Sequence, residues 1–469
     1  MVLSSITDGI TRSVESVTAS VSEIFEPSLR LGVTGLSGAG KTVFITSLVA
    51  NLLERGRMTQ LTAQSQGRIE TVVLQPQPDM TLPRFDFENH LSALLGDNPR
   101  WPASTRAISE LRLSFRLRPQ GFLGGLTGPS TLHLDIVDYP GEWLLDLALL
   151  DKSYDQWADE TLSRIGQRPE ASAFLAEARA ADGSLTLDES IAQSLAEGFT
   201  AYLIAARQSG WSDLTPGRFL LPGDLAGSPV LTFAPLPRPA RQPRSSLWRE
   251  MERRFEAYKA KVVKPFFRDH FSRIDRQIVL LDVLGAVHHG PRAVEDLRRT
   301  MAEVLSTFRP GVNRWLTSLL GGKRVERILF AATKADHLHH HQHPKLTAIT
   351  EALLADAKRR ADFSGAKTMA ISMASLRTTV EDTIQRDGAP LDVVRGRLMS
   401  GKQAAMHAGD LPSDPSRILA PAREGAEKWL DAEYGLMTFA PARMMLKPGE
   451  GPPHIRLDRA IEFLIGDKL

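Results

Sequence analysis

The fold of this chain is decided by the stretch Gly35-Leu36-Ser37-Gly38-Ala39-Gly40-Lys41-Thr42. It matches the pattern G-x-x-x-x-G-K-[S/T], whose glycines let the backbone curl until successive N–H groups point at phosphate oxygens. The lysine would reach the terminal phosphates as a mobile charge, and the threonine hydroxyl would bind Mg²⁺. We therefore predict a binding loop for a purine nucleoside triphosphate, formed by Gly35, Ser37, Gly38, Ala39, Gly40, Lys41, Thr42 and Val43.

The segments on both sides of this loop support the interpretation. Residues 29–34 (LRLGVT) predict a short buried strand, and residues 41–53 carry apolar side chains at helical spacing. In this order of strand, loop and helix, the positive end of the helix faces a bound phosphate. An ordinary glycine-rich turn is the alternative, and the context argues against it.

The rest of the chain alternates predicted strands and helices, which indicates an α/β fold of the P-loop NTPase type, a three-layer sandwich. Further strands are predicted at residues 71–74, 110–117, 132–137, 277–283, 327–332 and 368–372. Further helices are predicted at residues 85–95, 292–308, 346–360 and 457–465.

Residues 145–275 interrupt the alternation of strands and helices, because they are charged, mostly helical in pattern and contain no predicted strand. We predict a mainly helical insertion there, which divides the chain into segments. These are an N-terminal helical arm (1–27), the first part of the core (28–144), the insertion (145–275), the second part of the core (276–380) and a C-terminal extension with a terminal helix (381–469).

A second motif, Asp138-Tyr139-Pro140-Gly141-Glu142, follows the apolar segment 132–137. A carboxylate at the carboxyl end of a strand beside the phosphate loop can bind Mg²⁺ directly or through water. Gly141 would bring a backbone N–H near the γ-phosphate. Alone, this pattern fits a plain turn equally well, and the phosphate loop makes the binding interpretation stronger.

A third motif, Thr333-Lys334-Ala335-Asp336, follows the apolar segment 327–332. A carboxylate in this place can accept hydrogen bonds from N1–H and the 2-amino group of guanine, a donor pair that adenine lacks. Charge-assisted hydrogen bonds contribute about 1.5–3 kcal/mol each, which is enough to select guanine. The alternative is a solvated helix start that Asp336 caps.

The order of these motifs resembles that of the Ras-like P-loop GTPases, and the wider pattern resembles the YcjX-like family of bacterial P-loop GTPases. The narrower resemblance covers nearly the whole chain. It is carried by the phosphate loop, by Asp138–Glu142, and by the segments WPASTR (101–106), TKADHLHHHQH (333–343) and HIRLD (454–458). It implies Mg²⁺-dependent hydrolysis of GTP to GDP and phosphate by a slow molecular switch in a bacterial stress-related role.

The resemblance also implies residue roles. Thr105, with Ser104 as a substitute, is similar to the switch threonine that senses Mg²⁺ and the γ-phosphate. The implied metal ligands are then Thr42, Thr105 and Asp138. The implied catalytic residues are Lys41, Thr105, Gly141 and Glu142. Arg106 or Arg100, close to Thr105 in sequence, could supply a positive group from the chain itself, and a surface arginine is the alternative. Thr333, Lys334 and Asp336 would bind guanine, together with backbone N–H groups of Ala374 and Ser375.

The chain departs from the Ras pattern in three respects. Thr333 stands where Asn is commoner, so the bracing of the guanine loop would differ. Glu142 stands in place of the glutamine that orients water, and its carboxylate would repel the γ-phosphate. The helical insertion follows this second switch directly, which makes it a candidate surface for an unidentified protein partner.

Composition sets limits on other functions. The formal net charge of +2 is too small to predict nucleic-acid binding, and the absence of Cys excludes disulfides and thiolate metal sites. No signal peptide or long apolar run is evident, so we expect a cytoplasmic protein that associates with membranes only peripherally, if at all. A P-loop ATPase and a scaffold that binds nucleotide structurally remain alternatives.

Two further segments invite functional interpretations. Residues 337–343 (HLHHHQH) could bind Zn²⁺ or Ni²⁺, but the lack of Cys and of unassigned acids nearby favours an exposed loop or a helix on the nucleotide side. Residues 249–276 interleave basic and aromatic side chains, which could bind nucleic acid or acidic lipid. Acidic residues in the same run favour a solvated helix face with an aromatic core stripe.

Overall fold

The computed structural model describes residues 26–36, 38–103, 107–119, 129–306, 325–363, 365–430 and 432–469. Almost all of the predicted N-terminal arm (1–27) lies outside these ranges. Ser37 of the phosphate loop and the triplet Ser104, Thr105 and Arg106 also lie outside them.

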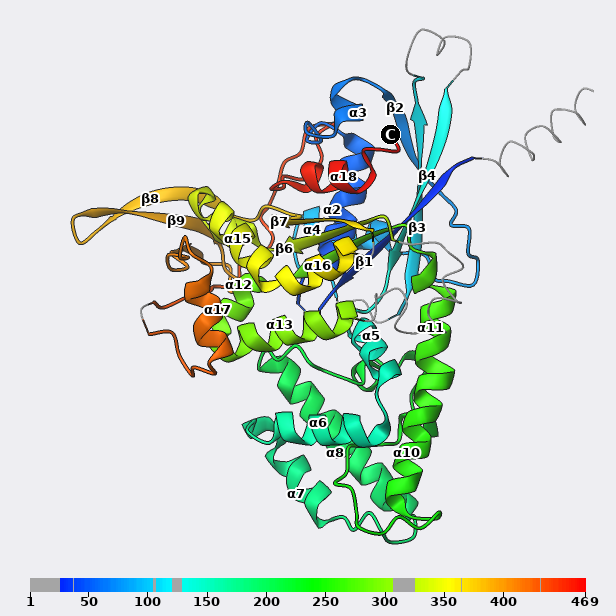
Figure 1. Ribbon diagram of the computed structural model, residues 1–469. Coiled ribbons are helices and arrows are strands. Elements are labelled where there is room, and N and C mark those ends of the chain that lie inside the picture. The colour runs from blue at the N-terminus through cyan, green and yellow to red at the C-terminus, as the bar shows by residue number, and fades with distance from the viewer. Residues whose placement is uncertain are drawn as a thin grey trace, which may run out of the picture.

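A seven-stranded sheet with the order β2-β3-β4-β1-β5-β6-β7 forms the centre of the molecule (Figure 1). Strand β3 runs antiparallel to β2 and β4, whereas β1, β4, β5, β6 and β7 pair in parallel. All seven predicted strands are confirmed, as β1 (Ser28–Gly35), β2 (Ile69–Gln75), β3 (Ser109–Leu117), β4 (Ser130–Asp138), β5 (Arg276–Leu281), β6 (Arg327–Ala332) and β7 (Lys367–Ser372).

Both faces of the sheet are buried, because alternate side chains along each central strand enter different cores. In β5, Ile278 and Leu280 belong to one hydrophobic cluster, and Val279 and Leu281 to the other. The first cluster lies under α2 (Lys41–Glu54) and α18 (Leu457–Ile465). The second lies under α12 (Val283–His289), α13 (Pro291–Ser306) and α15 (His343–Leu353). The resulting arrangement is the α/β sandwich that the alternation of elements predicts.

The terminal helix α18 forms part of this sandwich, although the sequence places it in the C-terminal extension. Its apolar side chains are buried in the same cluster as those of α2. The guanidinium of Arg276 on β5 is fully buried and donates to the carbonyl oxygen of Leu464 at 2.9 Å and to Asp467 at 2.9 Å. The last residues of the chain therefore cover the sheet.

Between β4 and β5 the chain folds into a lobe of helices below the sheet in the view of Figure 1. Its helices are α5 (Gly141–Leu145), α6 (Tyr154–Ile165), α7 (Ser172–Ala180), α8 (Glu189–Gln208), α9 (Gly217–Leu220), α10 (Leu247–Tyr258) and α11 (Lys264–Asp269). The lobe has an aromatic centre, in which Trp157 stacks on Phe255 with ring centroids 5.0 Å apart. Phe255, Tyr258 and Phe266 are buried, so the aromatic side chains of the basic run form the predicted core stripe.

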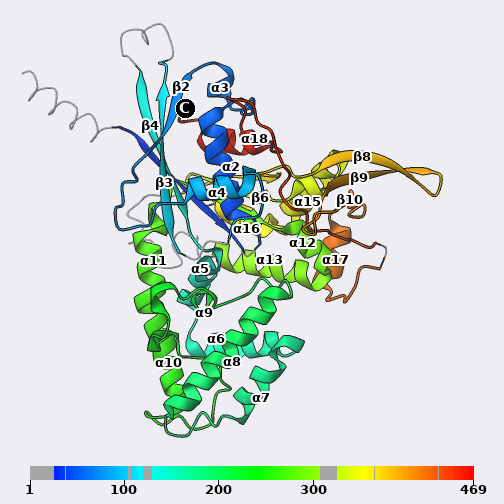
Figure 2. The same cartoon turned by 180° about the vertical axis from the view of Figure 1, so that it is seen from behind.

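The C-terminal extension adds a three-stranded antiparallel sheet, made of β8 (Val380–Arg386), β9 (Ala389–Arg397) and β10 (Gln403–Met406). Figure 2 shows this sheet projecting beyond α15, with α17 (Ser416–Arg423) near it. The predicted helix at 346–360 is divided into α15 and α16 (Ala355–Phe363). No helix in the described parts of the chain combines the length and the apolar content needed to span a bilayer.

The burial of α18 predicts a large cost for truncating its core side chains. Leu464→Ala should lower the free energy of unfolding by about 2–5 kcal/mol, because Leu464 is fully buried. Leu430 is 91% exposed, so Leu430→Ala is a matched control that should change stability by no more than about 0.5 kcal/mol. Urea denaturation measures both values, and equal effects would contradict the role of α18 as part of the core.

Candidate functional site

The carboxyl ends of β1, β6 and β7 open into one cavity of about 950 Å³. The phosphate loop lines it at one side, and the turn after β6 lines it at the other. From the predicted nucleotide-binding set, the cavity brings together Gly38, Ala39, Gly40, Lys41, Thr42, Val43, Thr333, Lys334, Asp336, Ala374 and Ser375. These residues come from three separate parts of the sequence, so the fold itself assembles the candidate site.

The phosphate loop has the curled backbone that its glycines predict. Gly38 and Gly40 have φ angles of 76° and 83°, a left-handed conformation that other residues rarely adopt. The Lys41 ammonium lies over this loop and donates to the carbonyl oxygen of Gly35 at 2.6 Å. Within the described part of the chain Lys41 forms no ion pair with a carboxylate, so its charge stays at the mouth of the loop.

The oxygen donors expected to hold Mg²⁺ lie at the same end of the sheet. Thr42 is the second residue of α2, and Asp138 is the last residue of β4. Asp138 pairs in register with Val33 of β1, two residues before Gly35, and both Thr42 and Asp138 are buried. A hydroxyl and a carboxylate are hard oxygen ligands of the kind that Mg²⁺ prefers, so this pair fits the ion. The predicted ligand Thr105 lies outside the described residues.

Gly141 lies directly against the phosphate loop. A Cβ atom placed on it would be 1.9 Å from the carbonyl oxygen of Gly35, so only glycine can occupy the position without a shift of the backbone. The next residue, Glu142, is buried and lines the cavity. The second motif thus meets the first, as the sequence predicts.

The other helices and loops of the lobe hold the residues that follow Glu142 in place. Trp143 donates to the carbonyl oxygen of Leu221 at 3.3 Å, and Arg218 stacks on its ring with a guanidinium-to-centroid distance of 3.2 Å. Asp146 accepts hydrogen bonds from the Gly217 amide at 2.7 Å and from the Tyr258 hydroxyl at 2.5 Å. Burial raises the pKa of Asp146 to about 7, although these two hydrogen bonds lower it.

The turn after β6 carries the residues predicted to bind guanine. Asp336 is only 4% exposed, which excludes a solvated cap, and it accepts hydrogen bonds from the amide and hydroxyl of Thr378 at 2.9 and 2.8 Å. Burial alone would raise the pKa of Asp336, but His337 and Thr378 outweigh it and hold the pKa below its usual value. Asp336 is therefore an ionised acceptor. Lys334 has a left-handed backbone and pairs with Asp282.

The backbone amide of Ala374 does not have the free donor that the resemblance implies, because it donates to another part of the chain. It donates to the carbonyl oxygen of Ile455 at 3.1 Å, and the Ile455 amide donates back at 2.8 Å. The Ala374 N–H is therefore occupied by the chain that leads into α18, and it is not available to a guanine oxygen while this bridge holds. Ala374 and Ser375 still line the cavity.

Several lining residues come from regions where no motif signals a site. The helical lobe contributes Arg207 and residues 220–223, and the C-terminal extension contributes residues 436–439. Trp101 and Pro102 precede the predicted switch threonine, and the Trp101 indole donates to the carbonyl oxygen of Phe439 at 2.8 Å. The residues of the lobe and of the C-terminal extension could be found only from the fold, whereas Trp101 and Pro102 belong to the segment WPASTR that carries the family resemblance.

Comparison with known proteins extends over almost the whole chain. Residues 29–469 match the YcjX-like family, DUF463. The chain is 38% identical over 457 residues to the Ras-like GTPase YcjX of Escherichia coli K12, covering 94% of this chain and 96% of the relative. It is 34% identical over 467 residues to the Ras-like GTPase YcjX of Shewanella oneidensis MR-1, covering 94% of each. The resemblance predicted from the motifs is confirmed.

The raised pKa of Asp146 predicts a specific pH dependence. In the folded state Asp146 titrates near 7, against a usual value of 3.8, so the native state retains a proton that the unfolded state releases. Its contribution to stability is full below about pH 4 and is lost as the pH rises toward 7. Asp146→Asn places a side chain of the same shape at this position that stays uncharged at every pH, so the variant should lack this pH dependence.

We expect the difference in unfolding free energy, variant minus wild type, to rise by on the order of 2 kcal/mol between pH 5 and pH 8. Chemical denaturation at the two pH values measures this difference. Asp387→Asn is the matched control, since the Asp387 side chain is 94% exposed. A difference that stays constant with pH would show that Asp146 is already ionised at pH 5.

Proposed function

This chain belongs to the YcjX-like family, and from that premise we propose that it binds GTP and GDP with Mg²⁺ and slowly hydrolyses GTP to GDP and phosphate. One observation carries the proposal. A single cavity contains a phosphate loop at one side and a buried, ionised Asp336 at the other. Its volume of about 950 Å³ lies within the range of about 300–1,000 Å³ that is usual for pockets of small ligands and cofactors.

The guanine end of the cavity supports GTP over ATP. The Asp336 carboxylate has lone pairs beyond those used by Thr378, so it can accept from N1–H and the 2-amino group of guanine. Adenine presents an acceptor at N1 and no 2-amino group, so it would place an acceptor against the carboxylate and offer it no hydrogen bond. A P-loop ATPase remains the alternative, and it requires ATP to bind better than GTP.

We propose that Lys41 and the loop amides offset the charge that develops on the phosphates during in-line attack by water. When Mg²⁺ is bound at Thr42 and Asp138, it adds positive charge at the same oxygens. Glu142 lines this side of the cavity and could accept a proton from the attacking water. Thr105 keeps its proposed role as the threonine that senses Mg²⁺ and the γ-phosphate.

Arg207 is a candidate for the positive group that the chain itself supplies. It lies in the last turn of α8 and lines the cavity together with Lys41 and Glu142. Within the described part of the chain its guanidinium forms no hydrogen bond or ion pair, in contrast to many other arginines of the lobe, such as Arg168 and Arg254. A guanidinium placed in this way can stabilise charge on a transferring phosphoryl group.

The biological role belongs to the same proposal. The resemblance implies a slow switch in a bacterial stress-related role. We further propose that the protein acts in the cytoplasm and that the helical lobe, which follows the second motif directly, is the surface for an unidentified protein partner. The contacts of Trp143 and Asp146 support the part assigned to the lobe, because they connect it to the residues that follow Glu142 at the cavity. A scaffold without turnover is the alternative, and it requires GDP binding with no hydrolysis of GTP.

Base selectivity tests the guanine site. Asp336→Asn places an amide donor opposite the 2-position of the base, which suits the 2-carbonyl of xanthine and not the 2-amino group of guanine. We expect GTP affinity to fall by at least about tenfold and preference to move toward xanthosine triphosphate. Calorimetric titration of both nucleotides measures the change. Asp387→Asn is the control, and a variant that still prefers GTP would remove Asp336 from the site.

Single-turnover kinetics test the arginine. Arg207→Ala should lower the rate of GTP hydrolysis by about 10³-fold, because a single arginine finger contributes about 10³–10⁵. GDP affinity should change little. Arg179→Ala is a matched control, since Arg179 lies on the exposed face of α7 in the same lobe. If Arg207→Ala hydrolyses GTP at the wild-type rate and Arg106→Ala does not, the role belongs to Arg106.

A further inference from the structure

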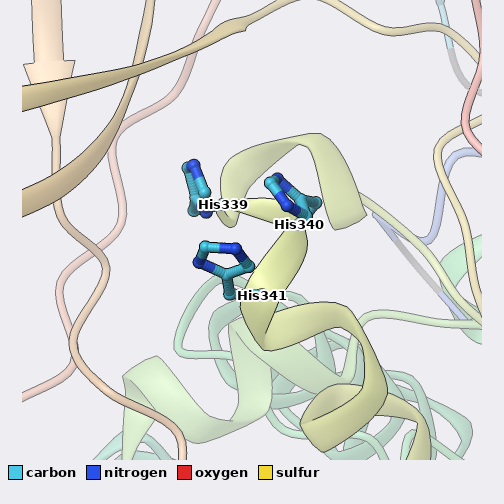
Figure 3. A group of neighbouring side chains, drawn as sticks. All are labelled: His339, His340 and His341. Carbon is cyan, nitrogen blue, oxygen red and sulfur yellow. The ribbon is translucent and has the colours of Figure 1, made fainter.

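Three consecutive histidines gather at one point beside the C-terminal sheet. His339, His340 and His341 lie just before α15, and Figure 3 shows their rings grouped on one side of the chain. The ring centroids are 4.1 to 4.6 Å apart, and one ring nitrogen from each histidine lies within 4.8 Å of one from each of the others. Consecutive side chains on an extended segment would point apart, so the local turn brings them together.

The fold adds two carboxylates that the sequence places at a distance from the histidines. Glu381 on β8 lies 2.7 Å from Nδ1 of His340 and 3.8 Å from Nε2 of His339. Asp392 on β9 lies 3.2 Å from Nδ1 of His341 and 3.6 Å from Nδ1 of His339. The cluster therefore contains both kinds of ligand, imidazole nitrogen and carboxylate oxygen.

The spacing around His339 fits an ion better than it fits a hydrogen bond. A tetrahedral Zn²⁺ with bonds of about 2.0–2.1 Å holds its ligand atoms about 3.3 Å apart. The distances from Asp392 Oδ2 to Nδ1 of His341 and of His339, 3.2 and 3.6 Å, lie on either side of that value. Nδ1 of His339 is buried and has no hydrogen-bond partner within the described residues. A buried polar atom without a partner is costly, and a metal ion would compensate it.

We propose that His339, His340, His341 and Asp392 bind one divalent transition-metal ion of the Zn²⁺ class, separate from the Mg²⁺ and nucleotide site. Glu381 holds Nδ1 of His340, which leaves Nε2 of that ring for the metal. A carboxylate behind a ligating histidine fixes its tautomer and orientation in many zinc sites. His340 and His341 are 57% and 66% exposed, so an ion can reach the cluster from solvent.

The ion would join two parts of the chain that flank the guanine end of the cavity. The histidines follow Asp336 along the chain. Glu381 lies on β8, which begins directly after Thr379, and Asp392 lies on β9, which pairs with β8. Thr378 donates to the Asp336 carboxylate, and the Thr379 hydroxyl donates to the backbone carbonyl oxygen of Asp336. A metal at the histidines would hold β8 and β9 against this turn and stabilise the sheet that otherwise projects from the core.

Titration with Zn²⁺ alone tests the site. The full chain without an affinity tag is stripped with chelator, freed of nucleotide and titrated calorimetrically in excess Mg²⁺, which does not compete for imidazoles. We expect one Zn²⁺ per chain and a higher unfolding temperature with Zn²⁺ than without it. His339→Gln should abolish both effects. Glu381→Gln should weaken binding by about 10–100-fold, the usual loss when the carboxylate that orients a ligating histidine is removed.

His288→Gln is the matched control, because His288 is an exposed histidine outside the cluster. It should bind Zn²⁺ as the wild type does. If His339→Gln does not fold, Asp392→Asn takes its place, since Asp392 is a partly exposed side chain on β9. The proposal fails if the wild type binds no Zn²⁺ at micromolar concentration, or if the cluster variants bind it as tightly as His288→Gln does.

Discussion

The approach of Gly141 to the carbonyl oxygen of Gly35 is the constraint on which the arrangement of the site depends. A Cβ atom at position 141 would lie 1.9 Å from that oxygen, so the second motif can lie this close to the phosphate loop only because residue 141 is glycine. The approach follows from the sheet, since β1 and β4 are parallel neighbours whose carboxyl ends lie together. Lys41 donates to the same carbonyl oxygen. The carbonyl group of Gly35 therefore contacts both the lysine of the loop and the Asp138–Glu142 motif.

This constraint gives the helical lobe a direct connection to the phosphate side of the cavity. A short helix begins at Gly141. Within and just after it, Trp143 contacts Leu221 and Arg218 of the lobe, and Asp146 contacts Gly217 and Tyr258. A Cβ atom on Gly217 would lie 2.1 Å from the carbonyl oxygen of Glu142, so this contact is also restricted to glycine. Packed interfaces shift between discrete arrangements more readily than they deform. Any movement of Gly141 would therefore require the lobe to move with it.

The sequence predicts the sheet because each strand is a short apolar run bounded by turn residues, and every one of the seven is found. It predicts the phosphate loop and the turn at Asp336 because both have fixed local spacing. It does not predict Arg207, Phe439 or the carboxylates beside the histidines, since these reach their positions through long-range packing. Asp392 lies 51 residues beyond His341, and pairing of β8 with β9 is what places Glu381 on the neighbouring strand.

The assignment of residues 381–469 to an extension understates their part in the core. The chain returns from β10 through Phe439, whose carbonyl oxygen accepts from Trp101, and through Ile455, which pairs with Ala374 at the end of the cavity lined by Asp336. It then ends in α18, whose apolar face is buried beside α2, the helix that begins at the phosphate loop. Both ends of the cavity are thus held by the same final segment. Because Trp101 and Ala374 both line the cavity, widening the cavity for exchange of the proposed nucleotide would have to displace this segment from at least one of these contacts.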